Sequence, residues 1–424
     1  MDSGQVRTLA VVGGGVAGIV ASYLLQRRFE VSLFEKNDYI GGHTHTIVID
    51  EGPDAQTPVD TGFIVFNDKT YPLFNRFLAQ LRVEKQKSSM SFSHFDARSG
   101  MMYASTNMDT FLAQRSNLFR PSFWLMSLAV LRFNHITKNH LEEGKLRGLT
   151  LGEFLSVHRF NRYFVEQYLI PICASVWSAP DVRMLEFPME TFARFFLNHG
   201  LLSVVNQPQW YVVKGGSHTY VNAFLKTFRG RVYPATPVAA VTRGDAGVTL
   251  KTVDGTEHPF DAVVLACHAD ESLRLLADAH PDERRLLGAW EYSRNRTILH
   301  HDTSFLPPMQ KVWASWNYMR MEAVESGSPV TLTYYMNRLQ GFSTRRPYCV
   351  TLNPKKPIQD GAIVRDMIYH HPVYTRESME TQRGIAGMNG QKSTYFCGSY
   401  LGNGFHEDAV RSAAAVARIF GIEL

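Results

Sequence analysis

The sequence predicts an α/β fold with a Rossmann-like dinucleotide-binding domain and a second, α+β domain. Near the start, a short apolar strand leads into a glycine-rich turn and a helix, and a second strand behind them ends in an acidic residue. Further along, long stretches rich in Phe, Tyr, Trp and Met read first as helices and later as strands. With 424 residues, 45% of them hydrophobic, the chain is long enough for two domain-sized cores.

The first element is the strand Thr8 to Val12, whose mostly apolar residues suit a strand buried on both faces of a parallel sheet. The pattern G-x-G-x-x-G follows at Gly13, Gly15 and Gly18. In this pattern the first glycine permits a tight turn, the second lets a pyrophosphate approach the backbone, and the third lets helix and strand pack closely. A helix over about 17–27 would present its free N–H groups to the phosphates.

The second strand, Val31 to Phe34, ends in Glu35, seventeen residues after Gly18. A carboxylate there accepts hydrogen bonds from a ribose diol and repels a 2′-phosphate, which disfavours NADP. A lone G-x-G-x-x-G is a weak signal. Strand, glycines, helix, strand and terminal acid in this order predict dinucleotide binding.

The residues after Glu35 distinguish FAD from NAD. NAD enzymes usually continue into further β-α units, whereas here Gly41, Gly42, His43 and Thr44 follow at once and lead into an extended "TIVID". Two glycines would let this loop lie against an extended dinucleotide. The arrangement resembles the flavin-containing amine oxidoreductase superfamily, in which the second glycine pair also touches the FAD pyrophosphate. The resemblance implies FAD as the cofactor and an FAD-binding domain of the amine oxidase type.

The same family closes its FAD site with the last strand and helix of the chain. Here "STYFCGSYLGNGFHEDAVRSAAAVARIF" reads as a strand ending at Cys397, a glycine-bearing loop over 398–404 and an amphipathic helix over about 407–420. That helix would aim its positive N-terminal end at the flavin pyrimidine, where reduced flavin carries negative charge near N1. The alternative is a helix that only caps the sheet.

A third element, "WYVVKGGSHTYVNAFLKTF", places Gly215 and Gly216 before a helix that begins near Ser217, and a β-meander follows. In the family this segment returns the chain to the FAD domain, and Val238 matches the residue whose backbone meets the adenine. The expected FAD-binding domain is therefore discontinuous, over 1–70, 210–290 and 371–424. The expected substrate domain covers 71–209, which reads as helical, and 291–370, which reads as sheet.

Candidate site residues follow from these matches. His406, at the mouth of the last helix, is the candidate proton acceptor, although it could instead be a helix-entry residue that only bonds the cofactor. Lys311 resembles the lysine that holds a water against flavin N5 in amine oxidases. The expected cofactor-binding residues are Gly13, Gly15, Val16, Ala17, Gly18, Glu35, Lys36, Gly41, Gly42, His43, Thr44, Thr61, Gly62, Phe63, Val238, Gly398, Ser399, Phe405, His406, Glu407 and Ala409.

No metal site is expected. The candidate ligands would be His43 and His45 and the pairs His300–His301 and His370–His371. Adjacent residues on a strand point to opposite faces, so neither pair converges without help from elsewhere. The absence of a G-x-S-x-G elbow and of a CxxC pair removes the commonest hydrolase and dithiol interpretations.

Four stretches resemble a narrower group: "VDTGFIVFN", "WASWNY", "TYYMNRLQ" and "FCGSYLGNGFHEDAV". They are similar to bacterial predicted NAD/FAD-binding flavoproteins often encoded beside cyclopropane-fatty-acyl-phospholipid synthase-like methyltransferases. The resemblance implies hydride transfer from a methylated fatty acyl chain of a membrane lipid to flavin N5, which desaturates the chain on the way to methyl-branched dienes or furan fatty acids. Leu401 and Asn403 replace the usual aromatic residues, which leaves the acyl substrate open. The alternatives are an amine oxidase for a soluble amine, a non-redox acyl double-bond isomerase and a flavin-stabilised binding protein.

The charge and the cysteine content limit the binding partners and the cellular location that the sequence predicts. The net charge of +5 comes from scattered Lys and Arg, which gives nucleic-acid binding little support but allows weak attraction to an anionic membrane. The longest apolar run, Phe123 to Val130, is expected to be a buried helix, with interfacial docking on lipid as the alternative. No secretion signal is evident, and four dispersed cysteines fit a reduced cytoplasmic protein, peripheral at the inner membrane surface if its substrate is there. A covalent flavin link to Cys397 is conceivable, although "TYFCG" reads as a buried strand.

Overall fold

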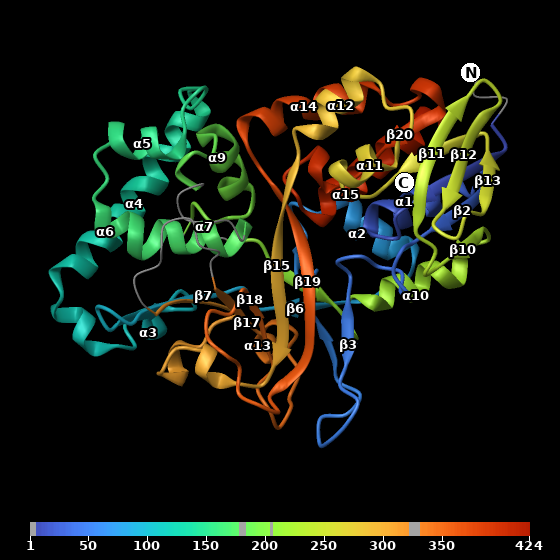
Figure 1. The fold of residues 1–424 in the computed structure, drawn as a ribbon. Helices are drawn as coiled ribbons and strands as arrows, with labels where there is room; N and C mark the ends of the chain where they lie inside the picture. The colour runs from blue at the N-terminus through green and yellow to red at the C-terminus, as the bar shows by residue number, and fades with distance from the viewer. Residues whose placement is uncertain (1–5, 178–183, 204–206, 322–330) are drawn as a thin grey trace.

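The computed structural model describes residues 6–177, 184–203, 207–321 and 331–424. A five-stranded parallel sheet forms the first half of the molecule, on the right of Figure 1. Three separated stretches of the chain supply its strands. In spatial order they are β10 (Arg231–Tyr233), β2 (Glu30–Phe34), β1 (Thr8–Val12), β14 (Ala262–Leu265) and β20 (Thr394–Phe396).

Alternating residues of β1 and β14 enter two different cores, because successive side chains of a strand point to opposite faces. Leu9 and Val11 pack under α1 (Val16–Leu25) and α15 (His406–Ile419), with α2 (Pro72–Gln80) and α10 (His218–Thr227) beside them. Ala10 and Val12 pack against a second core. That core is built from β11 (Val238–Gly244), β12 (Gly247–Thr252), β13 (Glu257–Phe260), α11 (Ala269–Leu275), α12 (Pro281–Gly288) and α14 (Arg376–Gly387).

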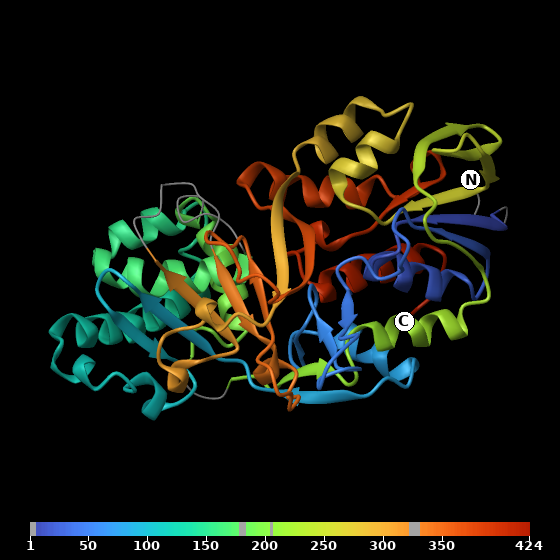
Figure 2. The ribbon, with the colours of Figure 1, turned by 60° about the horizontal axis from the view of Figure 1, so that its bottom comes forward.

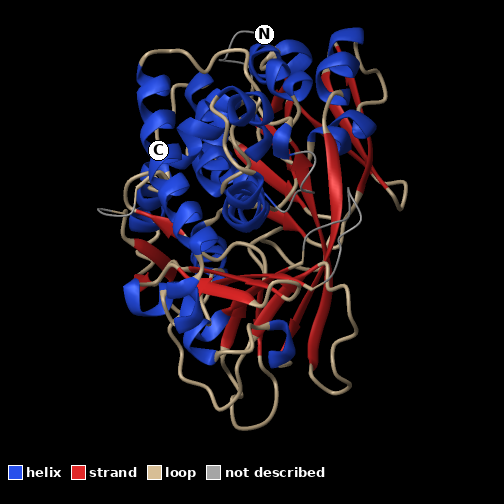
Figure 3. Cartoon of the chain, turned by 90° about the vertical axis from the view of Figure 1, so that its left-hand side faces the viewer, coloured by secondary structure: helices blue, strands red, loops and turns tan. Residues whose placement is uncertain are grey.

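A seven-stranded mixed sheet forms the second half. Its order is β19 (Ile363–Val373), β15 (Glu291–His300), β18 (Cys349–Leu352), β17 (Leu332–Tyr335), β16 (Trp316–Arg320), β7 (Phe92–Asp96) and β8 (Met101–Ala104). The long strands β15 and β19 run between the two halves (Figures 1 and 2). A helical lobe lies beside this sheet and gathers above its strands in the side view of Figure 3. It comprises α3 (Met108–Phe111), α4 (Pro121–Glu142), α5 (Leu151–Val157), α6 (Arg162–Phe164), α7 (Ile170–Trp177) and α9 (Met189–Asn198).

Short strands join the halves below α2 and α10. The pair β3 (Thr46–Val48) and β4 (Pro58–Asp60) is antiparallel, and β9 (Trp210–Val213) lies between β5 (Phe66–Asn67) and β6 (Lys85–Ser88). These strands carry the chain from the parallel sheet toward the seven-stranded sheet. The loop 61–63 between β4 and β5 is thereby held close to the parallel sheet.

The predicted α/β class is confirmed, and so are the opening strand–helix–strand unit and the closing strand and helix. The structure corrects the expectation at three places. The stretch after Tyr71 contains β6, β7 and β8 as well as helices, and residues 336–339 form the helix α13 (Met336–Leu339) rather than more strand. The strand β10 joins the parallel sheet instead of the meander. The expected domain boundaries stay a prediction; their ranges include residues 1–5, 178–183, 204–206 and 322–330, which lie outside the described residues.

The helix α4 contains the apolar run that was expected to be buried. Its inner face is buried at Phe123 and Met126, but Leu125 and Leu128 are exposed, so the prediction is right for one face only. Within the described ranges, no helix combines the length and apolar content that crossing a bilayer requires.

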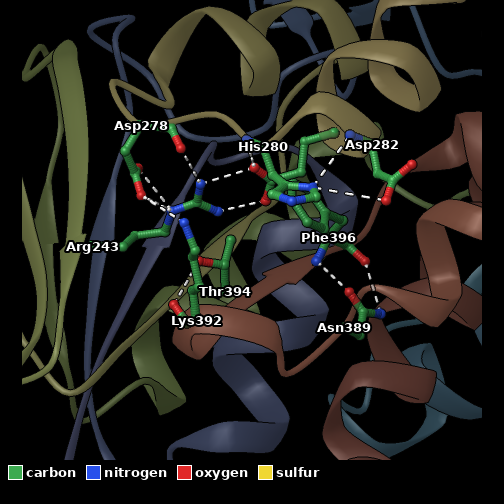
Figure 4. A network of polar contacts seen from close by, with 9 residues as sticks. Arg243, Asp278, His280, Asp282, Asn389, Lys392, Thr394 and Phe396 are labelled. Atoms are coloured by element: carbon green, nitrogen blue, oxygen red, sulfur yellow. Dashed lines mark hydrogen bonds and ion pairs between the residues drawn. The ribbon is translucent and has the colours of Figure 1, made fainter.

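A buried ion-pair network fixes β11 to α12 (Figure 4). The guanidinium of Arg243 donates to Glu283 from both terminal nitrogens, with Nη2 2.8 Å from Oε2, and its Nε lies 2.9 Å from Oδ1 of Asp278. The side chains of Arg243 and Glu283 are 1% and 8% exposed. Lys392, next to β20, contacts the same Asp278, so the network ties the meander to the edge of the parallel sheet.

We expect Arg243→Met to lower the free energy of unfolding by about 3–5 kcal/mol, because it leaves the Glu283 carboxylate buried without its cation. Adding Glu283→Gln in the same chain should recover part of this loss. The matched control is Arg285→Ala on the same helix, which breaks the exposed pair with Asp282 and should cost less than about 1 kcal/mol. Chemical denaturation measures all three, and equal losses for Arg243→Met and Arg285→Ala would contradict this account of the network.

Candidate cofactor site

The first glycine turn leaves open space beside Gly15. A Cβ atom built on Gly18 would lie 1.8 Å from the carbonyl oxygen of Gly13, so only glycine lets α1 pack this closely. A Cβ built on Gly15 would meet no atom within 4 Å. The N–H of Gly15 has no acceptor among the described residues. The Gly15 N–H, at the start of α1, is therefore available to a ligand in the open space beside it. Val16 and Ala17, the first residues of α1, are buried behind it.

The second glycine pair lies directly against the first turn. The N–H of Gly41 donates to the carbonyl of Gly14 at 2.9 Å, and a Cβ on Gly42 would come within 3.1 Å of the Gly15 Cα. Gly42 has a positive φ of 58°, and its N–H has no acceptor in the described part of the chain. Two N–H donors from two loops are thus available at one place, which suits a pyrophosphate.

Glu35 lies at the carboxyl end of β2, as the sequence predicts. One carboxylate oxygen accepts from the Gly14 N–H at 2.7 Å and the other from the Asn37 N–H at 2.9 Å. The Glu35 carbonyl accepts from the N–H of Thr236 at 2.8 Å, which brings the start of β11 at Val238 near this edge. The predicted residue Lys36 turns outward, where its Nζ contacts Glu271 at 2.6 Å.

The C-terminal segment reaches the same region. Cys397 donates its N–H to Leu265 of β14, and the Gly398 N–H donates to Oγ of Ser412 in α15. Ser399 begins a single helical turn, after which the loop leads to Phe405 and α15. Within the described residues, the N–H groups of His406 and Glu407 have no acceptor. The positive end of a fourteen-residue helix is therefore unpartnered at its backbone.

The Glu407 side chain has a structural role at the start of α2. Its two carboxylate oxygens accept from the N–H groups of Leu73 and Phe74 at 3.0 and 2.9 Å, at the start of α2. The carboxylate therefore caps α2 and ties α15 to it. Only the backbone of Glu407 is left to meet a cofactor. Ala409, the last predicted residue, is buried in the α15 core.

The His406 ring is enclosed at the junction of three segments. It stacks on the Phe63 ring with centroids 3.4 Å apart, and its Nε2 lies 3.1 Å from Thr44 Oγ1 and 3.2 Å from the Tyr220 hydroxyl. Burial lowers the pKa of His406 to about 3, so the ring is neutral at ordinary pH. The ring therefore holds the start of α15 against the loop after Gly42 and the loop 61–63.

The loop 61–63 is fastened to the second glycine loop by its backbone. Thr61 and Phe63 donate their N–H groups to the carbonyls of His45 and His43, the latter at 2.7 Å. A Cβ on Gly62 would lie 2.2 Å from the His43 carbonyl oxygen, so this approach requires glycine. The structure thus brings the predicted residues Thr61, Gly62 and Phe63 beside His43.

Two histidines that sequence reasoning did not assign to the cofactor site lie beside His43. The His371 and His268 rings have centroids 5.5 and 6.3 Å from that of His43, whose buried Nε2 has no hydrogen-bond partner among the described residues. Burial lowers the pKa of all three, to about 4 for His371. The sequence signals were the pair His370–His371 and the position of His268 directly after the buried strand over 262–265. No metal-ligand cluster occurs in the residues that the structure describes.

Lys311 is not part of this cluster. Its Nζ forms an ion pair with Asp109 at 2.7 Å, and its side chain is 45% exposed. The structure therefore gives no support to the comparison of Lys311 with a lysine near flavin N5.

These features fit FAD. Unpartnered N–H groups at Gly15 and Gly42, open space beside Gly15 and an orphaned imidazole nitrogen on His43 suit the pyrophosphate. The free N–H groups of His406 and Glu407 suit the flavin carbonyl oxygens and the negative charge of reduced flavin. All of them lie beyond the carboxyl ends of parallel strands, where open α/β sheets bind ligands.

Comparison with known proteins gives one family match. A family model described as flavin containing amine oxidoreductase matches residues 16–294. A curated relative, 1-hydroxycarotenoid 3,4-desaturase from Flavobacterium sp. (strain P99-3), is 26% identical over 165 residues, which are 38% of this chain and 31% of that protein. The match thus spans about a third of the relative's length.

Solved structures with the same fold cover nearly the whole chain. A CLA-producing fatty acid isomerase from P. acnes has a TM-score of 0.71 at 15% identity, over 99% of this chain and 100% of that chain. Putrescine oxidase bound to putrescine has a TM-score of 0.70 at 12% identity, over 97% of this chain and 98% of that chain. At these identities the likeness shows the fold alone.

We expect Gly15→Val to lower FAD affinity by about tenfold or more, because the new side chain fills the space that the pyrophosphate needs. Folding should be unaffected, since a Cβ there meets no neighbour. Equilibrium dialysis against FAD measures affinity, and circular dichroism confirms the fold. The matched control is Gly244→Val, which also has open space at the end of β11. Unchanged FAD affinity in Gly15→Val would contradict the assignment.

Proposed function

The chain belongs to the flavin containing amine oxidoreductase family and is an FAD-dependent oxidoreductase, and we propose that it desaturates an apolar substrate. The specific substrate that we propose is a fatty acyl chain of a membrane lipid, methylated before it reaches this protein. Hydrogen would be removed from two adjacent carbons of that chain, one as a hydride and one as a proton.

The observation that carries this proposal is the contact between aromatic side chains of the two halves, beside the start of α15. The Phe405 ring stacks on the Phe195 ring with centroids 4.8 Å apart. It packs against the core under α1 and α15 and also against the core of the helical lobe. The two carboxylates that follow Phe405 along the chain are both occupied. Glu407 caps α2, and Asp408 accepts from the N–H groups of Asn403 and Phe405 and pairs with Arg411. An uncharged acyl chain matches such a surface.

The names of two similar proteins point the same way. One is a desaturase of a hydroxycarotenoid and the other a fatty acid isomerase. Both names describe lipid substrates. The methylated acyl chain and a lipid methyltransferase as pathway partner rest on the narrower resemblance in the sequence. A cytoplasmic location with peripheral contact at the inner membrane surface is part of the same proposal.

The chain's own groups would orient the cofactor and substrate. When bound, FAD accepts a hydride equivalent at N5. The donors at Gly15 and Gly42 would fix the pyrophosphate, and the N–H groups of His406 and Glu407 would stabilise negative charge at the pyrimidine. The packing of Phe195 and Phe405 would shield the bound acyl chain from bulk solvent.

For His406 we propose the positioning role, the second of the two roles that the sequence left open. Its imidazole is already engaged with Thr44 and Tyr220, and a pKa of about 3 makes it a weak base. Its ring holds the helix start in place while its backbone N–H remains available to the cofactor. The proton acceptor is therefore left to a water or to a group of the substrate.

A second candidate is oxidation of a soluble amine. The buried hydroxyl of Tyr374 has no hydrogen-bond partner in the part of the chain that the structure describes, and it lies 2.8 Å from a Cβ built on Gly404, next to Phe405. Two aromatic side chains near the flavin end would also suit an amine substrate, because a ring face attracts the ammonium form.

Anaerobic titration of the FAD-loaded protein separates these functions. We expect a phospholipid with a methylated acyl chain to bleach the oxidised flavin band, because the acyl chain transfers two electrons to the cofactor. A soluble amine should leave the band unchanged. Bleaching by amines alone would replace the proposal with amine oxidation. An altered acyl double bond without net bleaching would make the protein an isomerase.

The role of His406 is tested by His406→Asn. We expect lower FAD affinity with the same pH dependence of flavin reduction, because the neutral ring positions the helix and transfers no proton. His301→Asn, at a partly exposed histidine, is the control. Stopped-flow reduction from pH 5 to 8 measures the profile, a range chosen to bracket the ordinary histidine pKa of about 6.5. Loss in the variant of a pH-dependent step seen in the native protein would show His406 to be the proton acceptor.

A further inference from the structure

The outer face of α4 and the turn before it expose a row of large apolar side chains. Leu125, Leu128 and Leu131 are 60%, 62% and 52% exposed, and Phe119 is 86% exposed. Trp124, whose Nε1 donates to the carbonyl of Leu118 at 3.0 Å, connects the turn to the helix. We call this set the α4 apolar face: Leu118, Phe119, Trp124, Leu125, Leu128 and Leu131.

Folding does not require this face. The opposite side of α4, with Phe123, Met126, Ala129, Val130 and Phe133, already fills the core of the helical lobe. The exposed positions 124, 125, 128 and 131 follow one another at helical spacing, so they form a continuous stripe. A helix that is apolar on both sides is normally buried, and a contiguous exposed stripe marks an interaction surface.

The charged residues within the segment 110–141, which carries the stripe, are all basic, and Arg115 is paired with Asp109 just before that segment. Between Thr110 and Leu141 the chain has Arg115, Arg120, Arg132 and Lys138 but no Asp or Glu. Arg120 and Lys138 form no ion pair with a described residue, and Arg132 bonds the carbonyl of His158. Leucine and aromatic residues flanked by Arg and Lys are the composition of helices that lie in the surface of an anionic membrane.

We propose that the α4 apolar face docks on an anionic phospholipid bilayer, with its leucine and aromatic side chains at the boundary of headgroups and acyl chains. A second copy of this chain is the less suitable occupant, because a two-fold contact would place the basic residues of both copies side by side. The inference deepens the proposed function and rests on it for the source of the acyl substrate. The exposed stripe and its basic flanks argue for docking independently of the reaction.

The test is sedimentation of the FAD-loaded protein with vesicles of phosphatidylcholine alone and of phosphatidylcholine mixed with phosphatidylglycerol. We expect binding to the mixed vesicles and much weaker binding to the neutral ones. The variant Leu125→Ser/Leu128→Ser/Leu131→Ser should lose about tenfold or more in vesicle affinity, because each serine removes apolar area from the docked surface. Arg120→Gln/Lys138→Gln should lose the preference for anionic vesicles.

The matched control is Val253→Ser/Ile363→Ser/Ile419→Ser, which removes exposed apolar side chains elsewhere on the surface and should bind vesicles as the native protein does. Circular dichroism and the flavin spectrum verify that each variant is folded and loaded. Absence of vesicle binding by the native protein, or undiminished binding by the leucine variant, would overturn the proposal. So would light scattering that shows a dimer lost only in the leucine variant.

Flavin bleaching by detergent-solubilised lipid tests the proposed reaction separately from membrane docking. If docking is correct, the leucine variant should still be bleached in detergent while failing to bind vesicles. If the native protein binds vesicles but no acyl lipid bleaches its flavin, the proposed function is wrong and the docking proposal still holds.

Discussion

The close approach of two glycine-bearing loops beyond the parallel sheet is the constraint on which the cofactor site depends. A Cβ on Gly42 would come within 3.1 Å of the Gly15 Cα, and the Gly41 N–H donates to the Gly14 carbonyl, so the second loop meets the first at a residue without a side chain. With the loops in contact, the N–H groups of Gly15 and Gly42 are left at this contact without an acceptor among the described residues. The chain must then bring its last helix to the same edge, and the stack of His406 on Phe63 does this.

The local part of this arrangement could be predicted from the sequence. Glycine spacing, a valine-rich strand and a terminal acid each determine the local conformation through residues that are close together in the chain. Glu35 and Gly18 lie where those patterns put them. The orientation of individual side chains could not be predicted. Lys36 turns to Glu271 and the Glu407 carboxylate caps α2, and in both cases the partner is far away in the sequence.

Other features escaped prediction because they are tertiary. The strand β6 has the sequence "KQKS", which no strand propensity would select, and its pairing with β9 creates it. His268 and His371 come from different elements and meet His43 only in the folded protein. The apolar run of α4 left open whether the helix is buried or docks on lipid, since composition does not reveal which side of a helix is covered.

The most direct measurement of the central claim is the crystal structure of the protein with FAD. The account predicts one FAD per chain, with its pyrophosphate between Gly15 and Gly42 and its pyrimidine at the N–H groups of His406 and Glu407. Flavin bound elsewhere, or a pyrimidine remote from the start of α15, would show that the three separated segments do not form one cofactor site.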